Sequence, residues 1–374
     1  MNEIRLPNCN LSVPRLGFGG ASLVGGPSRS HSLKLLETAF DCGIRHFDVA
    51  PSYGLGSAED VLGEFASHHR GEITITTKFG SARPLAWQRV VVQWARVILR
   101  PVVSRASALK RPLIRTFTNH TPAGPKFEAA AMLRSLDISL RALRLERIDV
   151  FLLHEVGAGE LTDELFLALE RAEQDGKIGA WGIGSALQKL DRIADGPLTR
   201  ARVLQFEWAP TTSLQSKYPG TLVIVHQAIA GMFAPLRALL KNEILCRSWS
   251  ERVELDLTDR RELARMILAA ALASNADGMV LFWSSNLDRV RANTVALDAK
   301  YKEPGRRLLE LIAPNTAWPA ARADTALGGN TALAAGERQA VVASGPGRND
   351  RALPKPGQSC PGGRMPETRD HSRK

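Results

Sequence analysis

Short apolar runs alternate with helical patterns along most of this chain. Several of the runs are continuously apolar, which is typical of parallel strands that are covered on both faces. The predicted strands are Arg15–Ser22, Arg45–Pro51, Ile73–Gly80, Ile148–Glu155, Ala180–Ala186, Val203–Ala209, Thr221–Ile229 and Gly278–Ser284.

Helical segments are predicted between these strands. One apolar stripe with helical spacing is formed by Met132, Leu136, Leu140 and Leu143. The stretch Asp259–Ala273 also has a helical pattern, with Thr258 as its expected N-cap. Eight strand-then-helix units favour a closed barrel over an open sheet, so we expect an α/β fold, a single-domain (β/α)8 TIM barrel.

A long basic insert is predicted after the third strand, over residues 81–126. It has no acidic residue, and its basic residues are Arg83, Arg89, Arg96, Arg100, Arg105, Lys110, Arg111, Arg115 and Lys126. The insert thus accounts for most of the formal net charge of +11. We expect it to form a lid over the barrel mouth, with an amphipathic helix at Ala86–Leu99.

Three roles for that helix stay open at this stage. It packs on the barrel with its arginines in water, it makes peripheral contact with an anionic membrane through 86–100, or its arginines bind an acidic substrate. A nucleic-acid partner is not expected, because the segment has few interleaved aromatic residues beyond Trp87 and Trp94.

The composition changes from Pro319 onward. Residues 319–374 are rich in Gly, Pro, Ala and Arg, and such a segment buries too little apolar surface to offset its ordering entropy. We therefore expect one barrel domain over 1–318, including the insert, followed by a disordered tail over 319–374.

The remaining composition is that of an ordinary globular protein, with 44% hydrophobic and 23% charged residues among 374. No apolar run reaches about 18 residues and no secretory signal core is visible, so a cytoplasmic location is expected. The four cysteines Cys9, Cys42, Cys246 and Cys360 are widely scattered. This spacing predicts reduced thiols, with neither a disulfide framework nor a metal site.

Polar residues gather where three predicted strands end. The second strand runs into HFDVAPSYG, which holds Asp48 and Tyr53, while the third ends in TKFG with Lys78 and the fourth in LHE with His154. Barrel enzymes carry their chemistry at the C-terminal ends of the strands. These four side chains are therefore expected around one mouth.

The four residue types suit the reduction of a carbonyl group. A tyrosine with its ordinary pKa of about 10 is a poor acid at neutral pH, and a nearby ammonium is expected to lower that pKa. An aspartate can hold the lysine charged and oriented. A histidine can donate a hydrogen bond to the carbonyl oxygen and polarise it.

The runs GIRHFDVAPSYGLGSAEDVLGEF, ITTKFG and IDVFLLHE resemble the aldo-keto reductase family, over roughly residues 12–300. The resemblance implies an NAD(P)H-dependent oxidoreductase that transfers a hydride to or from a small aldehyde, ketone or sugar. It also implies that Asp48, Tyr53, Lys78 and His154 form a catalytic tetrad, with Tyr53 as the general acid/base.

The resemblance further implies cofactor contacts. Gln205 corresponds to the family residue that binds the nicotinamide carboxamide, and Ser185 supplies one member of a Ser-Asn pair whose second position is Ala186. His226 stands where the family often stacks an aromatic ring on the nicotinamide. The residues corresponding to those that hold the adenosine phosphate end are Ser284, Arg289 and Asn293.

The expected cofactor is NADP(H) rather than NAD(H), because Arg289 can pair with a 2′-phosphate at a helix N-terminus. Trp283 replaces a basic residue that often precedes the serine, so the preference should be modest. The chain has neither a GxGxxG run after a strand nor a GxxxxGK[ST] run, so the sequence lacks the signatures of a Rossmann dinucleotide site and of a P-loop. A cofactor-binding regulatory or interaction subunit on the same barrel is the alternative function, favoured by the incomplete carboxamide pair and by the basic insert.

Overall fold

The computed structural model describes residues 3–25, 28–84, 127–193, 195–210 and 218–314. The chain divides into two units, Met1–Ala332 and Leu333–Lys374, and the second lies wholly outside the described residues. The predicted helix at Ala86–Leu99, nearly all of the insert and the predicted tail also lie outside the described residues.

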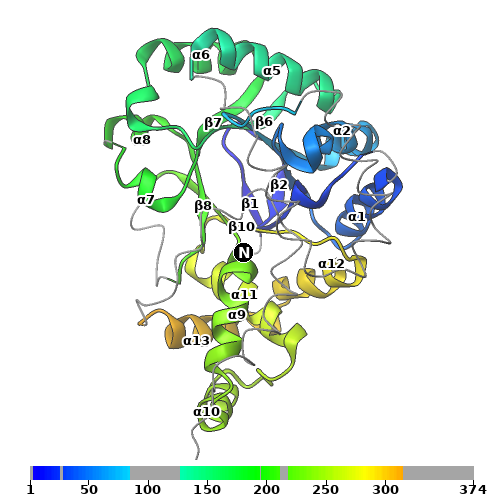
Figure 1. Ribbon diagram of the computed structural model, residues 1–374, viewed down its shortest axis with the longest axis vertical. Helices are drawn as coiled ribbons and strands as arrows, with labels where there is room; N and C mark the ends of the chain where they lie inside the picture. Colours follow the sequence, from blue (N-terminus) through cyan, green and yellow to red (C-terminus); the bar gives the residue numbers. More distant parts are fainter. Residues whose placement is uncertain (1–2, 26–27, 85–126, 194, 211–217, 315–374) are drawn as a thin grey trace, which may run out of the picture. The chain divides into compact units, whose positions relative to one another are not determined.

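Eight parallel strands close into a barrel in the order β10-β3-β4-β5-β6-β7-β8-β9, which confirms the predicted (β/α)8 fold (Figure 1). They are β3 (Leu16–Gly19), β4 (His46–Asp48), β5 (Thr74–Phe79), β6 (Ile148–His154), β7 (Ile178–Gly184), β8 (Val203–Glu207), β9 (Leu222–His226) and β10 (Met279–Phe282). Each matches one predicted strand. Most of the predicted runs extended too far, because their last residues belong to the loops of the barrel mouth.

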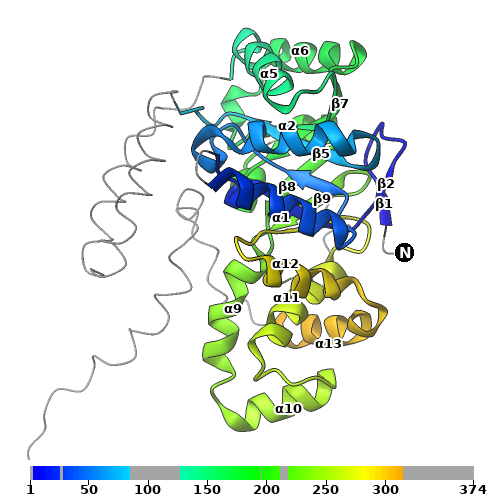
Figure 2. The ribbon, with the colours of Figure 1, turned by 90° about the vertical axis from the view of Figure 1, so that its right-hand side faces the viewer.

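The described helices lie outside the barrel. They are α1 (Arg29–Asp41), α2 (Ala58–His69), α5 (Ala129–Leu143), α6 (Asp163–Gln174), α7 (Leu187–Leu190), α8 (Asp195–Arg200), α9 (Ala228–Leu239), α10 (Glu243–Val253), α11 (Arg260–Ser274), α12 (Leu287–Thr294) and α13 (Lys302–Ile312). Both ribbon views show α5 and α6 side by side (Figures 1 and 2). The predicted apolar stripe of α5 faces the core, with Met132, Leu136 and Leu143 fully buried.

The predicted N-cap of α11 is wrong by one residue. Asp259 caps the helix, because its Oδ1 accepts hydrogen bonds from the backbone N–H groups of Arg261 (2.6 Å) and Glu262 (3.3 Å). Thr258 instead donates its hydroxyl to Asp256 Oδ1 at 2.6 Å. A carboxylate and a hydroxyl in neighbouring positions both suit a cap, and only the local backbone decides between them.

An N-terminal hairpin of β1 (Glu3–Arg5) and β2 (Ser12–Pro14), which sequence reasoning missed, lies beside the barrel strands (Figure 2). Its residues Leu6 and Val13 are buried in a cluster inside the barrel. The barrel residues of this cluster are Val150, Leu152, Val203, Ile224, Met279 and Leu281. Several of these stand near the start of their strands, so the hairpin covers the N-terminal end of the barrel and leaves the C-terminal end as the mouth.

None of the described helices combines the length and the apolar character that a bilayer-spanning segment needs. Of the four cysteines, the three within the described residues, Cys9, Cys42 and Cys246, are free thiols.

Candidate active site

Tyr53 is held at the mouth by the loop that follows β4. Gly54 has a left-handed backbone (φ 59°), and a Cβ atom at this position would lie 1.7 Å from the carbonyl oxygen of Leu23. Ser57 Oγ donates to the carbonyl of Gly54 at 2.6 Å and accepts from the backbone N–H of Gly25 at 2.7 Å. Only glycine permits this close approach, so the loop that carries Tyr53 is fastened to the loop after β3.

Lys78 lies at the centre of the candidate site, with its side chain 1% exposed. Its ammonium forms an ion pair with Asp48 Oδ1 and donates to the carbonyl of Val49 at 3.2 Å. The same Nζ atom lies 5.2 Å from the centroid of the Tyr53 ring. The other oxygen of Asp48 accepts a hydrogen bond from Gln205 Nε2 at 2.7 Å, so β4, β5 and β8 are joined through one carboxylate.

Burial and neighbouring charges both shift the pKa values of Lys78 and Tyr53. Burial lowers the pKa of Lys78, but the Asp48 carboxylate and Tyr53 outweigh burial, and the pKa stays above its usual value. Burial raises the pKa of Tyr53, and the Lys78 ammonium opposes this rise without overcoming it. The ammonium thus acts on the tyrosine pKa in the expected direction, but the net pKa is raised, because removing a phenolate from water outweighs one nearby cation.

Two histidines at the mouth are neutral at physiological pH. His154 ends β6 and His226 ends β9. Burial first, and then the charge of Lys78, lowers the pKa of each imidazole to about 3. A neutral ring carries a single N–H, so His154 is suited to donating one hydrogen bond rather than to supplying a proton.

Ser185 stands at the end of β7 and offers an unused polar group. Its Oγ is buried without a hydrogen-bond partner in the described part of the chain, while its backbone N–H donates to the carbonyl of Gln205 at 2.9 Å. A buried hydroxyl of this kind fits a polar ligand that supplies the missing partner. Ser185 and the Gln205 amide therefore suit a carboxamide such as that of nicotinamide, whereas Ala186 has no polar side chain to add.

The loop after β10 leads into α12 and is well ordered by its own hydrogen bonds. Ser284 Oγ accepts from the backbone N–H of Asn286 at 3.1 Å, and Asn286 Oδ1 accepts from that of Arg289 at 3.0 Å. Asn286 is thus the N-cap of α12, a role that sequence reasoning missed although Asn is a preferred cap. Arg289 is exposed beside this loop, and Asn293 is buried one turn later.

Three further charged residues, which sequence reasoning did not assign, lie near the mouth. Glu155 follows His154 directly and forms an ion pair with Lys189 of α7. Glu207 ends β8, and burial raises the pKa of its carboxyl group. The pairing of Glu155 with Lys189 joins residues 34 positions apart, and no spacing pattern in the sequence marks such a contact.

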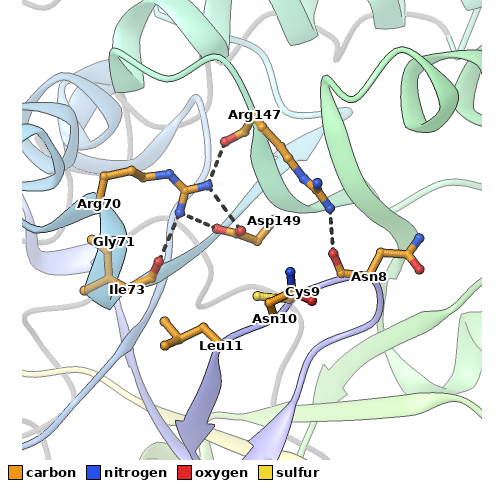
Figure 3. Close-up of a pocket in the computed structure, with 9 residues that line it drawn as sticks. All are labelled: Asn8, Cys9, Asn10, Leu11, Arg70, Gly71, Ile73, Arg147 and Asp149. Carbon is orange, nitrogen blue, oxygen red and sulfur yellow. Dashed lines mark hydrogen bonds and ion pairs between the residues drawn. The ribbon is translucent and has the colours of Figure 1, made fainter.

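The hollow of about 280 Å³ drawn in Figure 3 belongs to the opposite end of the barrel, near the starts of β5 and β6. Its charged side chains already form hydrogen bonds within the protein. Arg70 donates to both carboxylate oxygens of Asp149 at 3.0 and 3.2 Å, and Arg147 donates to the carbonyl of Asn8 at 2.6 Å. Asp149 also accepts from the backbone N–H of Ile75 at 2.7 Å. These contacts stabilise the N-terminal end of the barrel.

Within the described residues, no group of three His, Cys, Asp or Glu side chains is placed to hold a metal ion.

The chain resembles known proteins in sequence and in fold. The family model described as the aldo/keto reductase family matches residues 15–218, which is β3 through β8 and the segment to Tyr218. The D-threo-aldose 1-dehydrogenase of a Pseudomonas species is 33% identical over 202 residues, 50% of this chain and 55% of that protein. The chain thus spans about half the length of the curated relatives that it matches.

Solved structures share the fold at low sequence identity. A holo aldo-keto reductase of Bacillus halodurans has a TM-score of 0.59 and 20% identity, covering 83% of this chain and 96% of that one. A Klebsiella pneumoniae aldo-keto reductase in complex with NADPH has a TM-score of 0.53 and 18% identity, covering 79% and 89%. The family model covers more than half of the chain, and the eight strands of the chain close as a barrel. This chain therefore belongs to the aldo/keto reductase family.

Proposed function

We propose that the protein is an NAD(P)H-dependent oxidoreductase that transfers a hydride to or from a small aldehyde, ketone or sugar. The observation that carries the proposal is the buried contact of Lys78 with Asp48 beside the ring of Tyr53, at the C-terminal end of the barrel. Burying a charged ammonium group costs free energy. A buried ammonium at a barrel mouth is therefore a candidate for a catalytic role. The name of the Pseudomonas relative, an aldose dehydrogenase, agrees with this substrate class.

Tyr53 is the proposed general acid/base. The phenol is protonated at neutral pH, which is the form that reduction of a carbonyl requires, and the Lys78 ammonium opposes the rise in its pKa that burial causes. As negative charge develops on the substrate oxygen, Tyr53 delivers its proton there, and the Lys78 ammonium stabilises the phenolate that remains. In the oxidative direction the same proton returns to Tyr53.

Two other groups prepare this proton transfer. The neutral ring of His154 donates its N–H to the substrate oxygen and polarises the carbonyl. Asp48, held from its other side by Gln205, keeps the Lys78 ammonium charged and aimed. The four residues of the predicted tetrad thus have separate and complementary roles in the proposal.

The nicotinamide cofactor supplies the hydride when it is bound. Ser185 and Gln205 would hold its carboxamide, and His226 would lie against the ring. At the adenosine phosphate end, the proposed contacts are Ser284, Arg289 and Asn293, beside the N-terminus of α12. Because the exposed Arg289 can form an ion pair with a 2′-phosphate, we propose a modest preference for NADP(H). We also propose that the enzyme is cytoplasmic.

A panel of aldehydes, ketones and aldoses, followed by NADPH and NADH absorbance, tests the proposal. We expect turnover of at least one class, together with saturable cofactor binding in a fluorescence titration. Cofactor binding without turnover of any carbonyl compound would contradict the enzyme and support the regulatory subunit, which the incomplete carboxamide contact at Ala186 favours.

A further inference from the structure

The rim of the mouth beside His154 is charged rather than apolar, which gives it a part in substrate selection. We infer that the ion pair of Glu155 with Lys189 selects carbonyl substrates that carry a hydroxyl group next to the carbonyl carbon. The inference rests on the proposed function, because it names the substrate that the same mouth accepts.

The backbone places this pair at the C-terminal rim of the barrel, next to His154. Glu155 is the first residue beyond β6, directly after His154, and its backbone N–H donates to the carbonyl of Gly184 at 2.8 Å. Lys189 belongs to the short helix α7, which begins three residues after β7 ends at Gly184. The neighbouring ends of β6 and β7 therefore bring the carboxylate and the ammonium into contact at the rim.

The charges of the pair also act on the reacting groups. Glu155 is among the charges that raise the pKa of Tyr53, and Lys189 is among those that lower the pKa of His154. Because Glu155 directly follows His154, a substrate whose oxygen lies between Tyr53 and His154 would extend its carbon chain along the part of the rim that holds Glu155 and Lys189.

The pair offers what a hydroxyl group needs, an acceptor and a donor at one place. The carboxylate accepts the O–H, and the ammonium donates to the hydroxyl oxygen. Both side chains remain reachable from solvent, with 43% of Glu155 and 50% of Lys189 exposed. An aldehyde with a bare hydrocarbon chain would cover these charges without replacing their contacts with water, which is unfavourable.

The chain contains a matched control for this pair. Lys177 and Asp137 form an ion pair at 2.9 Å with nearly the same exposure, 42% and 44%, and Lys177 directly precedes β7, so this pair lies at the opposite end of the barrel. Half-exposed pairs contribute little to stability, so changing either pair should leave a folded protein.

The test compares 2-hydroxypropanal with propanal, which differs from it only by lacking the hydroxyl group next to the carbonyl carbon. The readout is the ratio of kcat/KM for the two aldehydes in wild type, Glu155→Gln and Lys189→Met, with Asp137→Asn and Lys177→Met as controls. We expect wild type to favour 2-hydroxypropanal, each rim variant to reduce the ratio by roughly 10- to 100-fold, as for a lost hydrogen bond to a charged group, and the controls to keep it.

A ratio that is unchanged in both rim variants would overturn the inference, as would a wild-type protein that does not distinguish the two aldehydes. In either case continued turnover would leave the proposed function standing. If wild type reduces neither of these aldehydes nor any other carbonyl compound, the proposed function fails and this inference fails with it.

Discussion

Lys78 is the side chain on which most contacts of the candidate site converge. Asp48 fixes its charge, Tyr53 lies against it, and both mouth histidines are kept neutral in part by its field. Burial and this one cation together shift the pKa values of its neighbours, as expected where water is excluded and charges interact strongly.

Replacing Tyr53 with Phe should reduce carbonyl reduction by about 10²- to 10⁴-fold, because the proton donor is lost while the ring is kept. Cofactor affinity should hardly change, since the phenol is not among the proposed cofactor contacts. Steady-state kinetics and a fluorescence titration with NADPH measure the two effects separately. Turnover at the wild-type rate would show that Tyr53 is not the acid/base.

His46 makes the stability of the barrel depend on pH. It is fully buried in β4 between Thr74 and Thr76, and burial followed by the charge of Lys78 lowers its pKa to about 3. Between about pH 6.5 and 3 the unfolded chain binds the extra proton, so the free energy of unfolding is fully kept above about 6.5 and falls as the pH falls.

His46→Gln should therefore flatten the decline in the free energy of unfolding between about pH 6 and 4. The expected change in slope is at most about 1.4 kcal/mol per pH unit, the value for one proton. Urea denaturation followed by circular dichroism at several pH values measures it. Parallel wild-type and variant curves would mean that His46 is not the titrating group.

At the scale of elements, the loop after β4 is the piece that brings Tyr53 to the mouth, and its geometry depends on Gly54. Gly54→Ala should reduce turnover strongly, because a Cβ atom 1.7 Å from the Leu23 carbonyl forces the loop and Tyr53 to move. Gly43→Ala is the matched control. Gly43 also has a positive φ, of 90°, but no atom lies within 4 Å of the position that an alanine methyl group would take there, so only the conformational penalty applies.

Kinetics and thermal unfolding of both variants separate the two effects. Gly43→Ala should lower the melting temperature but keep the activity of the folded protein, whereas Gly54→Ala should lose activity even where it is folded. Equal activity of the two variants would show that the contact of Gly54 with Leu23 does not position Tyr53.

The preference between the two cofactors should depend on the loop from β10 into α12. Arg289→Ala should weaken NADPH binding more than NADH binding, because only NADPH offers a 2′-phosphate to a guanidinium. Arg291→Ala is the control, since Arg291 already lies 3.4 Å from Asp288 on the same helix. Calorimetric dissociation constants for both cofactors measure the difference, and an equal loss for NADPH and NADH would contradict the assignment.

For the molecule as a whole, deleting 319–374 should leave a folded and active barrel. Every described element ends before residue 315, and the last helix, α13, buries Leu308, Leu309 and Ile312 and packs along α11. The truncated protein thus retains all described packing of the barrel. Circular dichroism and the carbonyl assay measure the result, and loss of the folded signal would show that the segment is needed for stability.

The sequence by itself determined the order and number of the barrel strands, and the ends of the strands only approximately. Short apolar runs that alternate with helical patterns favour buried parallel strands, and parallel strands place their C-terminal ends at one rim. For that reason Asp48, Lys78 and His154, far apart in the chain, could be expected together. The hairpin of β1 and β2 could not be predicted, because strands of three residues are too short to show a hydrophobic period.

Only the tertiary structure decided the electrostatics of the mouth. The direction of the Tyr53 pKa depends on the depth of burial against the field of Lys78, and neither quantity can be read from residue order. The contact of Gln205 with Asp48 and that of Lys189 with Glu155 likewise arise from barrel closure and from the path of α7. Hydrophobic periodicity is a local property of a chain, whereas desolvation and charge pairing depend on what folding brings near.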